Sequence, residues 1–170
     1  MKVAITGHTK NIGKHLYEKF SPDSIGFSRS NGYDITNKDD QMRIISEVKD
    51  CDVFINNAPA GFGQSELCLE LWYKWKDLNK TIINVGSRIA EDSVVLPLEY
   101  SHLLEYSMHK RTLKKLSEDL SKINSNVKVK YAWFGYVGTP EILAKYPHFT
   151  KNDYISIEKA SDIILGKVND

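Results

Sequence analysis

The sequence predicts an α/β fold built on a parallel sheet that helices cover on both faces. Short apolar runs rich in β-branched residues alternate with longer segments whose apolar residues repeat at helical spacing. No internal repeat, low-complexity tract or linker interrupts the 170 residues, so a single domain over residues 1–170 is expected. Because strands and helices alternate, the connections should be right-handed crossovers, which produce a doubly wound parallel sheet.

Strands are expected in six places along the chain. The strongest β patterns are "KVAIT" at residues 2–6, "CDVFINNA" at 51–58 and "KTIINVGS" at 80–87. The second strand, a brief third strand and the sixth strand are expected at residues 23–28, 33–35 and 126–135.

Amphipathic patterns predict the helices that connect and follow these strands. Asn37 is a plausible cap at the start of one of them. Trp72 and Trp75 share a helical face with two leucines, so both are expected to pack in the core. The helices are expected over residues 10–20, 37–50, 65–78, 104–123 and 156–168.

Composition narrows the classes of function. Lys and Arg total 23 against 22 Asp and Glu, a net charge of +1, which gives no electrostatic case for binding nucleic acid or a membrane. The chain shows neither a signal peptide nor an apolar run long enough to span a bilayer. Cys51 and Cys68 lack the spacing of a metal site, so no metal is expected, and reduced thiols indicate a cytoplasmic protein.

The first predicted strand runs into "TGHTKNIG", residues 6–13, and then into a helix. Such a turn presents backbone N–H groups and a helix N-terminus to a pyrophosphate, and Gly13 lets helix and strand approach closely. Asn11 stands where a middle glycine is usual. It tolerates left-handed backbone angles but brings a side chain toward the phosphates. An ordinary strand-to-helix turn is the alternative interpretation.

The second predicted strand ends in "FSRSNGYDIT". NAD-binding domains commonly place a carboxylate about 20 residues after the glycines to bind the ribose 2′-hydroxyl. Here Arg29 occupies that region between Ser28 and Ser30, and no carboxylate appears before Asp34. A guanidinium suits a 2′-phosphate, and Lys10 offers a second positive charge, so NADP(H) is preferred over NAD(H). The alternative is that both cations are merely solvated.

In their order along the chain, these motifs resemble those of the short-chain dehydrogenases/reductases. Residues 6–13 are similar to the family's Thr-Gly-x-x-x-Gly-x-Gly turn, "NNAP" at 56–59 to its Asn-Asn-Ala-Gly motif, and "INVGS" at 83–87 to its serine-ending strand. "YSMHK" at 106–110 matches Tyr-x-x-x-Lys, and "FGYVGTP" at 134–140 resembles Pro-Gly-x-Val-x-Thr. The resemblance covers about the first 140 residues and implies an unusually short member with a Rossmann-like sheet in the order 3-2-1-4-5-6.

The resemblance implies an oxidoreductase that interconverts a small carbonyl compound and its alcohol by hydride transfer. Tyr106 would exchange the proton with the substrate oxygen, and Lys110, on the same helical face, would hold the nicotinamide ribose and lower the Tyr106 pKa. Ser87 would hydrogen-bond the substrate oxygen, although a hydroxyl that caps a turn is the other interpretation. The expected cofactor-binding residues are Gly7, Thr9, Lys10, Asn11, Ile12, Gly13, Ser28, Arg29, Ser30, Asp34, Ile35, Asn57, Ala58, Tyr106, Lys110, Gly135, Val137 and Thr139.

Some features depart from the family pattern. The family carries an asparagine in the helix after "NNAP", thought to support a proton relay, but none lies between Asn57 and Asn79. The same helix normally helps to build the family's tetramer, and here it is short. The resemblance therefore does not fix the oligomeric state, and a homo-oligomer, either a dimer or a tetramer, is left as an alternative to a monomer. A non-catalytic NADP-binding sensor or scaffold is therefore the main alternative function. A sugar-nucleotide epimerase or dehydratase is disfavoured because the chain lacks the C-terminal substrate domain such enzymes need.

Overall fold

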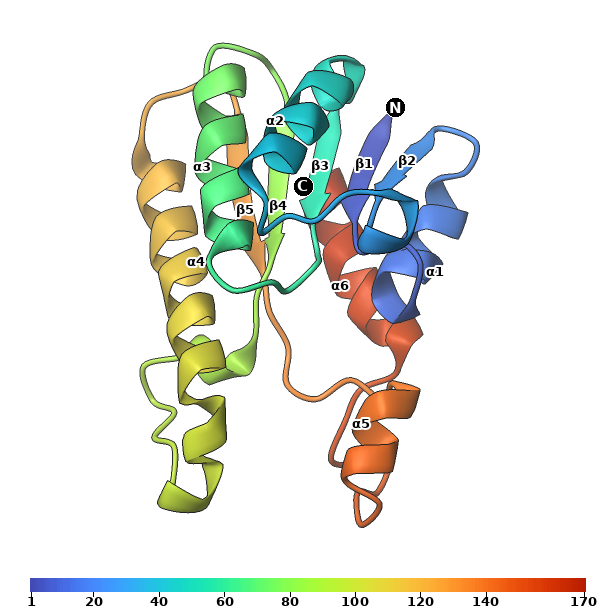
Figure 1. The fold of residues 1–170 in the computed structure, drawn as a ribbon, viewed down its shortest axis with the longest axis vertical. Coiled ribbons are helices and arrows are strands. Elements are labelled where there is room, and N and C mark those ends of the chain that lie inside the picture. Colours follow the sequence, from blue (N-terminus) through green and yellow to red (C-terminus); the bar gives the residue numbers. More distant parts are fainter.

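A computed structural model describes all residues from 1 to 170 (Figure 1). At its centre lies a five-stranded sheet in the order β2-β1-β3-β4-β5, and every neighbouring pair is parallel. All strands therefore end at the same edge of the sheet. The strands are β1 (Val3–Thr6), β2 (Ser24–Phe27), β3 (Val53–Asn56), β4 (Thr81–Val85) and β5 (Lys128–Ala132).

The expected strand at residues 33–35 does not form, so this part of the prediction is wrong. Asp34 makes local hydrogen bonds there instead: its Oδ1 accepts from the backbone N–H of Thr36 at 2.9 Å and from the Thr36 hydroxyl at 2.8 Å. Side-chain bonds of this kind favour a turn over a strand. The other five strands keep the expected relative order, and the doubly wound, Rossmann-like architecture is confirmed.

Helices cover both faces of the sheet (Figure 1). Asn37 caps its helix as expected, because its side-chain oxygen accepts hydrogen bonds from the N–H groups of Asp39 and Asp40. Among the α-helices, only the short α5 was not expected. On one face lie α2 (Lys38–Glu47), α3 (Gly63–Trp75) and α4 (Leu104–Lys122), on the other α1 (Asn11–Phe20) and α6 (Ile157–Asn169), and α5 (Pro140–Lys145) lies beyond the strand ends.

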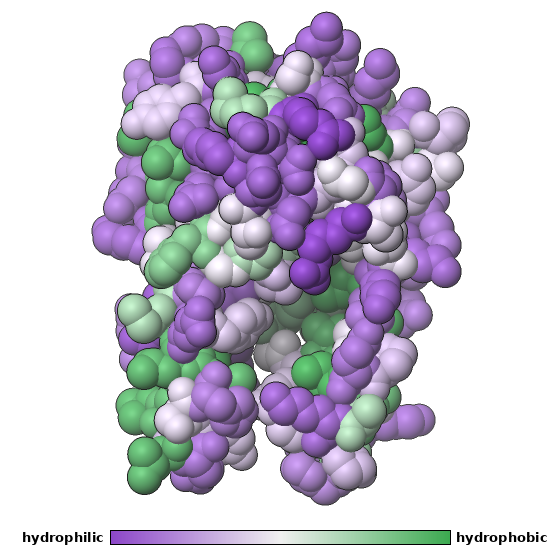
Figure 2. Space-filling view, in the orientation of Figure 1, coloured by the Kyte–Doolittle hydropathy of each residue, from purple (hydrophilic) through white to green (hydrophobic).

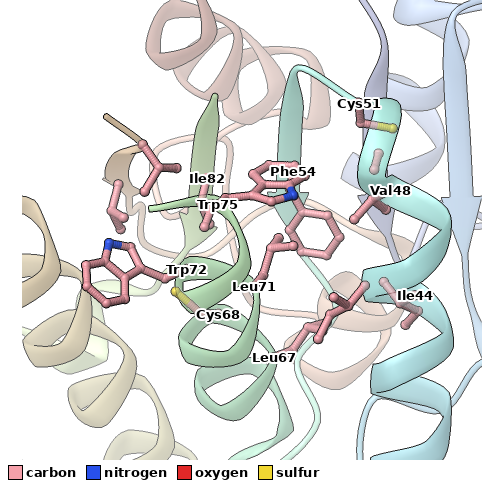
Figure 3. Close-up of a cluster of buried hydrophobic side chains, with 14 of the residues drawn as sticks. Ile44, Val48, Cys51, Phe54, Leu67, Cys68, Leu71, Trp72, Trp75 and Ile82 are labelled. Atoms are coloured by element: carbon pink, nitrogen blue, oxygen red, sulfur yellow. The ribbon is translucent and has the colours of Figure 1, made fainter. Parts of the chain in front are cut away.

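Two apolar cores form because side chains alternate between the faces of each strand. In β1, for example, Ala4 contributes to the core under α2 and α3, whereas Val3 and Ile5 contribute to the core under α1 and α6. Figure 3 shows the first of these cores. Trp72 and Trp75 are only 7% and 2% exposed, which confirms the prediction that both pack inside. None of the helices combines the length and the apolar character needed to cross a bilayer.

We expect Leu71→Ala to lower the free energy of unfolding by about 2–5 kcal/mol, because the substitution leaves a cavity in this core. Leu71 is fully buried among the α2, α3 and sheet side chains. The matched control is Leu78→Ala, which removes a 43% exposed leucine and should cost less than about 1 kcal/mol. Urea denaturation measures both values. Equal losses would contradict the assignment of this face of α3 to the core.

Candidate functional site

The site begins where the strand order reverses, between β1 and β3. Thr6, the last residue of β1, binds the chain that leaves β3. Its hydroxyl accepts hydrogen bonds from the N–H groups of Asn57 at 2.9 Å and Ala58 at 3.0 Å, and its carbonyl accepts from Asn57 Nδ2 at 3.0 Å. Two expected cofactor-binding residues, Asn57 and Ala58, thus lie beside the turn that follows β1.

The turn between β1 and α1 has the shape of an anion cradle. Asn11 has a φ of +49°, so it adopts the left-handed conformation expected of it. A Cβ atom on Gly13 would lie 2.1 Å from the Gly7 carbonyl oxygen, so only glycine permits this close approach of helix and turn. No side chain caps the first N–H groups of α1. These groups are therefore available to a phosphate, and the positive end of the helix dipole favours one.

The other expected cofactor-binding residues of this turn differ in how far their side chains are exposed. Thr9 and Lys10 are exposed, whereas Ile12 packs partly against the core below α1. The Asn11 side chain, expected to approach the phosphates, donates instead from Nδ2 to Glu141 Oε2 at 3.1 Å. The first turn of α5 is therefore held close to the glycine turn.

The turn after β2 lies next to the glycine turn, because β2 pairs with β1 and the Gly7 N–H donates to the Phe27 carbonyl at 2.7 Å. Asn31 closes this turn by accepting a 2.7 Å hydrogen bond from the Ser28 N–H. The Ser28 and Ser30 hydroxyls are 2.8 Å apart. Arg29 is exposed at the tip of the turn.

Neither Arg29 nor Lys10 forms an ion pair, so two cations on neighbouring turns are free to bind an anionic group. Asp34, which follows the turn after β2, is another of the expected cofactor-binding residues. Hydrogen bonds from the backbone and hydroxyl of Thr36 hold the pKa of its carboxyl below the usual range. Ile35, another expected cofactor-binding residue, is only 5% exposed and belongs to the core, and its carbonyl accepts a 2.7 Å hydrogen bond from Gln41 Nε2.

Tyr106, Lys110 and Ser87 meet at the same edge of the sheet. Tyr106 is 37% exposed in the first turn of α4, and the Lys110 Nζ atom lies 5.7 Å from the centroid of its ring. Burial raises the Tyr106 pKa, and a hydrogen bond with the Ser87 side chain acts in the opposite direction. Without a bound cofactor the tyrosine is therefore a neutral phenol at pH 7, whereas the expectation was a pKa lowered by Lys110.

Ser87 has two roles in the structure. Its hydroxyl accepts a 3.4 Å hydrogen bond from the Ile89 N–H and so caps the short 3₁₀ turn Arg88–Ala90, which is the alternative interpretation of this residue. The same hydroxyl interacts with Tyr106. The Ser87 N–H donates to the hydroxyl of Tyr131 at 3.4 Å, and burial raises the pKa of Tyr131 to about 12. The capping hydrogen bond thus orients a hydroxyl that also interacts with Tyr106.

Lys110 is buried without a carboxylate partner. It is 3% exposed, and its Nζ donates to Gln64 Oε1 at 2.8 Å and to the Val85 carbonyl at 2.9 Å. Burial lowers its pKa to about 7, because removal from water disfavours the charged form. The amine thus exists in both protonation states near neutral pH.

Gln64, which holds this amine, is a residue that the sequence analysis missed. It is 3% exposed in the first turn of α3, and its Nε2 donates to the Asn56 carbonyl at 2.5 Å and the Val85 carbonyl at 3.1 Å. The preceding Gly63 allows α3 to start here, since a Cβ on it would lie 2.2 Å from the Ile35 carbonyl oxygen. The only available sequence signal was a polar residue on an otherwise apolar helical face, which does not reveal a partner.

A cavity of about 70 Å³ lies beside Tyr106 and Lys110. His109, a second residue without a sequence prediction, contributes to its wall. The lining residues are Pro59, Ala60, Gly61, Gln64, Tyr106, His109 and Lys110. The cavity therefore lies between the chain segment that follows β3 and the face of α4 that carries Tyr106 and Lys110.

The expected cofactor-binding residues that follow β5 differ in how far they are exposed. Gly135 is exposed, but the Val137 side chain is 7% exposed and belongs to the core below α6. Thr139 caps α5, because its hydroxyl accepts a 3.3 Å hydrogen bond from the Ile142 N–H. Figure 2 shows the surface hollowed between two projections beyond the sheet, residues 86–108 on one side and α5 on the other.

Comparison with known proteins gives structural matches. No protein-family model matches the chain, and no curated protein matches its sequence. Solved structures do match over most of both chains. A short-chain dehydrogenase from Burkholderia cenocepacia in complex with NADP shares 20% identity with a TM-score of 0.79, covering 100% of this chain and 86% of its own.

Two further structures agree with this match. The 3-alpha-hydroxysteroid dehydrogenase of a Pseudomonas species, complexed with NADH, shares 17% identity with a TM-score of 0.74, covering 97% of this chain and 88% of its own. A short-chain dehydrogenase/reductase of unknown function from Caenorhabditis elegans, with cofactor, shares 20% identity with a TM-score of 0.71, covering 96% of this chain and 86% of its own. The chain has the fold of the short-chain dehydrogenases/reductases.

The buried Lys110 should make the stability of the protein depend on pH. Its folded-state pKa of about 7 lies below the value near 10.4 of an unfolded lysine, so the unfolded chain binds more protons between these pH values. Stability should therefore rise with pH, by about 2 kcal/mol between pH 7 and pH 9. Lys110→Met should abolish this rise in urea denaturation at the two pH values, and Lys115→Met, on the exposed face of α4, should retain it. A rise that persists in Lys110→Met would contradict the assignment.

Proposed function

We propose that the protein is an NADP(H)-dependent oxidoreductase of the short-chain dehydrogenase/reductase family that interconverts a small carbonyl compound and its alcohol. The main support is one juxtaposition: Ser87, Tyr106 and Lys110 meet at the edge of the sheet that also carries the glycine turn. An acid–base pair beside an anion-binding turn is the arrangement that such a reaction needs.

The residues around the cradle fit a dinucleotide phosphate. The uncapped N–H groups of α1 and the close approach at Gly13 suit a pyrophosphate, and Arg29 with Lys10 suits the extra phosphate of NADP. A bound nicotinamide dinucleotide would supply the hydride. The structures of similar proteins with NADP and with NADH support a nicotinamide cofactor without deciding between the two.

The proton chemistry would fall to Tyr106. Its raised pKa keeps the phenol protonated at pH 7, so in the reductive direction it can donate a proton to the oxygen of a carbonyl substrate. Ser87 would orient that oxygen and stabilise the negative charge that develops on it. The Lys110 Nζ atom lies 5.7 Å from the centroid of the Tyr106 ring. In its protonated form Lys110 would therefore stabilise the phenolate that remains after Tyr106 has donated its proton.

A non-catalytic NADP-binding sensor or scaffold is the second candidate, and one observation favours it. The cavity beside Tyr106 measures about 70 Å³, whereas small-molecule pockets commonly span about 300–1,000 Å³. In this case the same cradle would bind the cofactor without turnover. The two candidates differ in the effect of substitutions at Tyr106.

Arg29→Ala should remove most of the preference for NADPH. Loss of a charge-assisted hydrogen bond to the 2′-phosphate should weaken NADPH binding by about tenfold to a hundredfold and leave NADH binding nearly unchanged. Calorimetric titration with each cofactor measures the ratio, and Arg111→Ala, on α4, is the matched control. Equal affinity of the unmodified protein for NADPH and NADH would refute the assignment of Arg29.

Tyr106→Phe should abolish the oxidation of NADPH by a carbonyl substrate while cofactor affinity changes less than about threefold, since the phenol hydroxyl is the proposed proton donor. A spectrophotometric assay with a panel of aldehydes and ketones measures turnover. Tyr73→Phe, which alters an exposed tyrosine on α3, is the control. Turnover that survives in Tyr106→Phe would exclude this residue from the reaction, and cofactor binding without any turnover would favour the sensor.

A further inference from the structure

A carboxylate lies at the rim of the glycine turn. Glu141, in the first turn of α5, accepts a 3.1 Å hydrogen bond from Nδ2 of Asn11, the first residue of α1. The contact joins segments that are 130 residues apart in the sequence, at the place where α5 lies beyond the strand ends (Figure 1). A negative charge is thus held beside the uncapped N–H groups of α1.

The Glu141 carboxylate is ionised and fixed in position. Its own backbone N–H, the Asn11 amide and the Thr139 hydroxyl hydrogen-bond to it, and together with the positive charge of Lys10 they hold its pKa below the usual range. Thr139 also caps α5, and Pro140 occupies the start of the helix, so the backbone that carries Glu141 has a defined geometry.

Asn11 holds the same contact from the side of the glycine turn. Its φ of +49° is the left-handed conformation, which asparagine tolerates better than most residues. A glycine, which is usual at this position, would have no side chain with which to bind α5. The link between the turn and Glu141 therefore depends on the asparagine that this chain carries in place of that glycine.

The charges around the turn show what this contact does. Lys10 forms no ion pair, but its charge and that of Glu141 interact, so the carboxylate offsets part of the positive charge that the turn offers to an anion. A pyrophosphate at the N–H groups of α1 would carry negative charge on both phosphates close to Glu141. Coulomb repulsion between like charges would therefore oppose its binding.

We propose that Glu141 sets the affinity of the glycine turn for a dinucleotide, because its charge opposes the binding of the pyrophosphate. This inference rests on the cofactor site of the proposed function and concerns the strength of binding at that site. The pyrophosphate is common to NADPH and NADH, so Glu141 weakens the binding of both by the same factor. Arg29, in contrast, acts only on the 2′-phosphate. A turn with this carboxylate releases its cofactor more readily than one without it.

Glu141→Gln tests the proposal, since it removes the charge while the glutamine oxygen can still accept the hydrogen bond from Asn11. At low salt the variant should bind NADPH and NADH about threefold to tenfold more tightly than the unmodified protein, by the same factor for each. In about 1 M NaCl, where the Debye length falls to about 3 Å, this gain should disappear. Calorimetric titration measures the affinities. A purely structural role of Glu141 would not give a gain that salt removes.

Glu158→Gln is the matched control and should bind both cofactors like the unmodified protein. Glu158 also lies in the first turn of a helix with a hydroxyl cap and accepts a hydrogen bond from its own backbone N–H, but it belongs to α6. Asn11→Gly, which suits the φ of +49°, removes the tether. In that background Glu141→Gln should improve binding by a smaller factor, because the carboxylate is no longer held beside the turn.

An unchanged affinity in Glu141→Gln, a gain confined to NADPH, or an equal gain in Glu158→Gln would overturn the proposal and leave the proposed function standing. If the protein binds both dinucleotides but reduces no carbonyl compound, the proposed reaction fails, and the affinities still decide the role of Glu141. If neither Glu141→Gln nor the unmodified protein binds a dinucleotide, the cofactor site and this inference fall together.

Discussion

A chain of buried hydrogen bonds between amides joins the ends of β3 and β4 to helices α3 and α4. Asn56 Nδ2 donates to the Gln64 carbonyl at 2.7 Å and to Asn84 Oδ1 at 2.9 Å, and Asn84 Nδ2 donates to the Ser117 hydroxyl at 2.9 Å. Gln64 then holds the Lys110 amine. Because a buried polar group left unpaired is costly, each member fixes the position of the next. The edge of the sheet at which the candidate site lies depends on this network.

Most elements of the fold were predictable because their signals are local. The amphipathic spacing of Leu67, Leu71, Trp72 and Trp75 predicted the buried face of α3, and the short side chain of Asn37 predicted a helix start. The third strand failed for a local reason as well. Three residues carry too little β pattern to outweigh the hydrogen bonds that Asp34 makes with Thr36.

The candidate site was predictable as a set of motifs but not as an electrostatic environment. The turns that carry Lys10 and Arg29 were expected around one ribose, and they lie side by side because β1 and β2 pair. The direction of the Tyr106 pKa was not predictable, since burial outweighs the hydrogen bond with Ser87 and burial depends on residues distant in sequence. Gln64 and His109 were missed for the same reason, because their roles arise only when α3 and α4 meet.

Gly63 shows how a missing side chain can govern a distant one. The helix α3 can begin against the Ile35 carbonyl only because position 63 carries a lone hydrogen. A methyl group there would wedge the first helical turn outward, and Gln64, the next residue, would move with it. The amine of Lys110 would then lose its hydrogen bond to Gln64, although the substitution lies on a different helix. The space beside one backbone carbonyl thus determines where the buried polar groups of the candidate site lie.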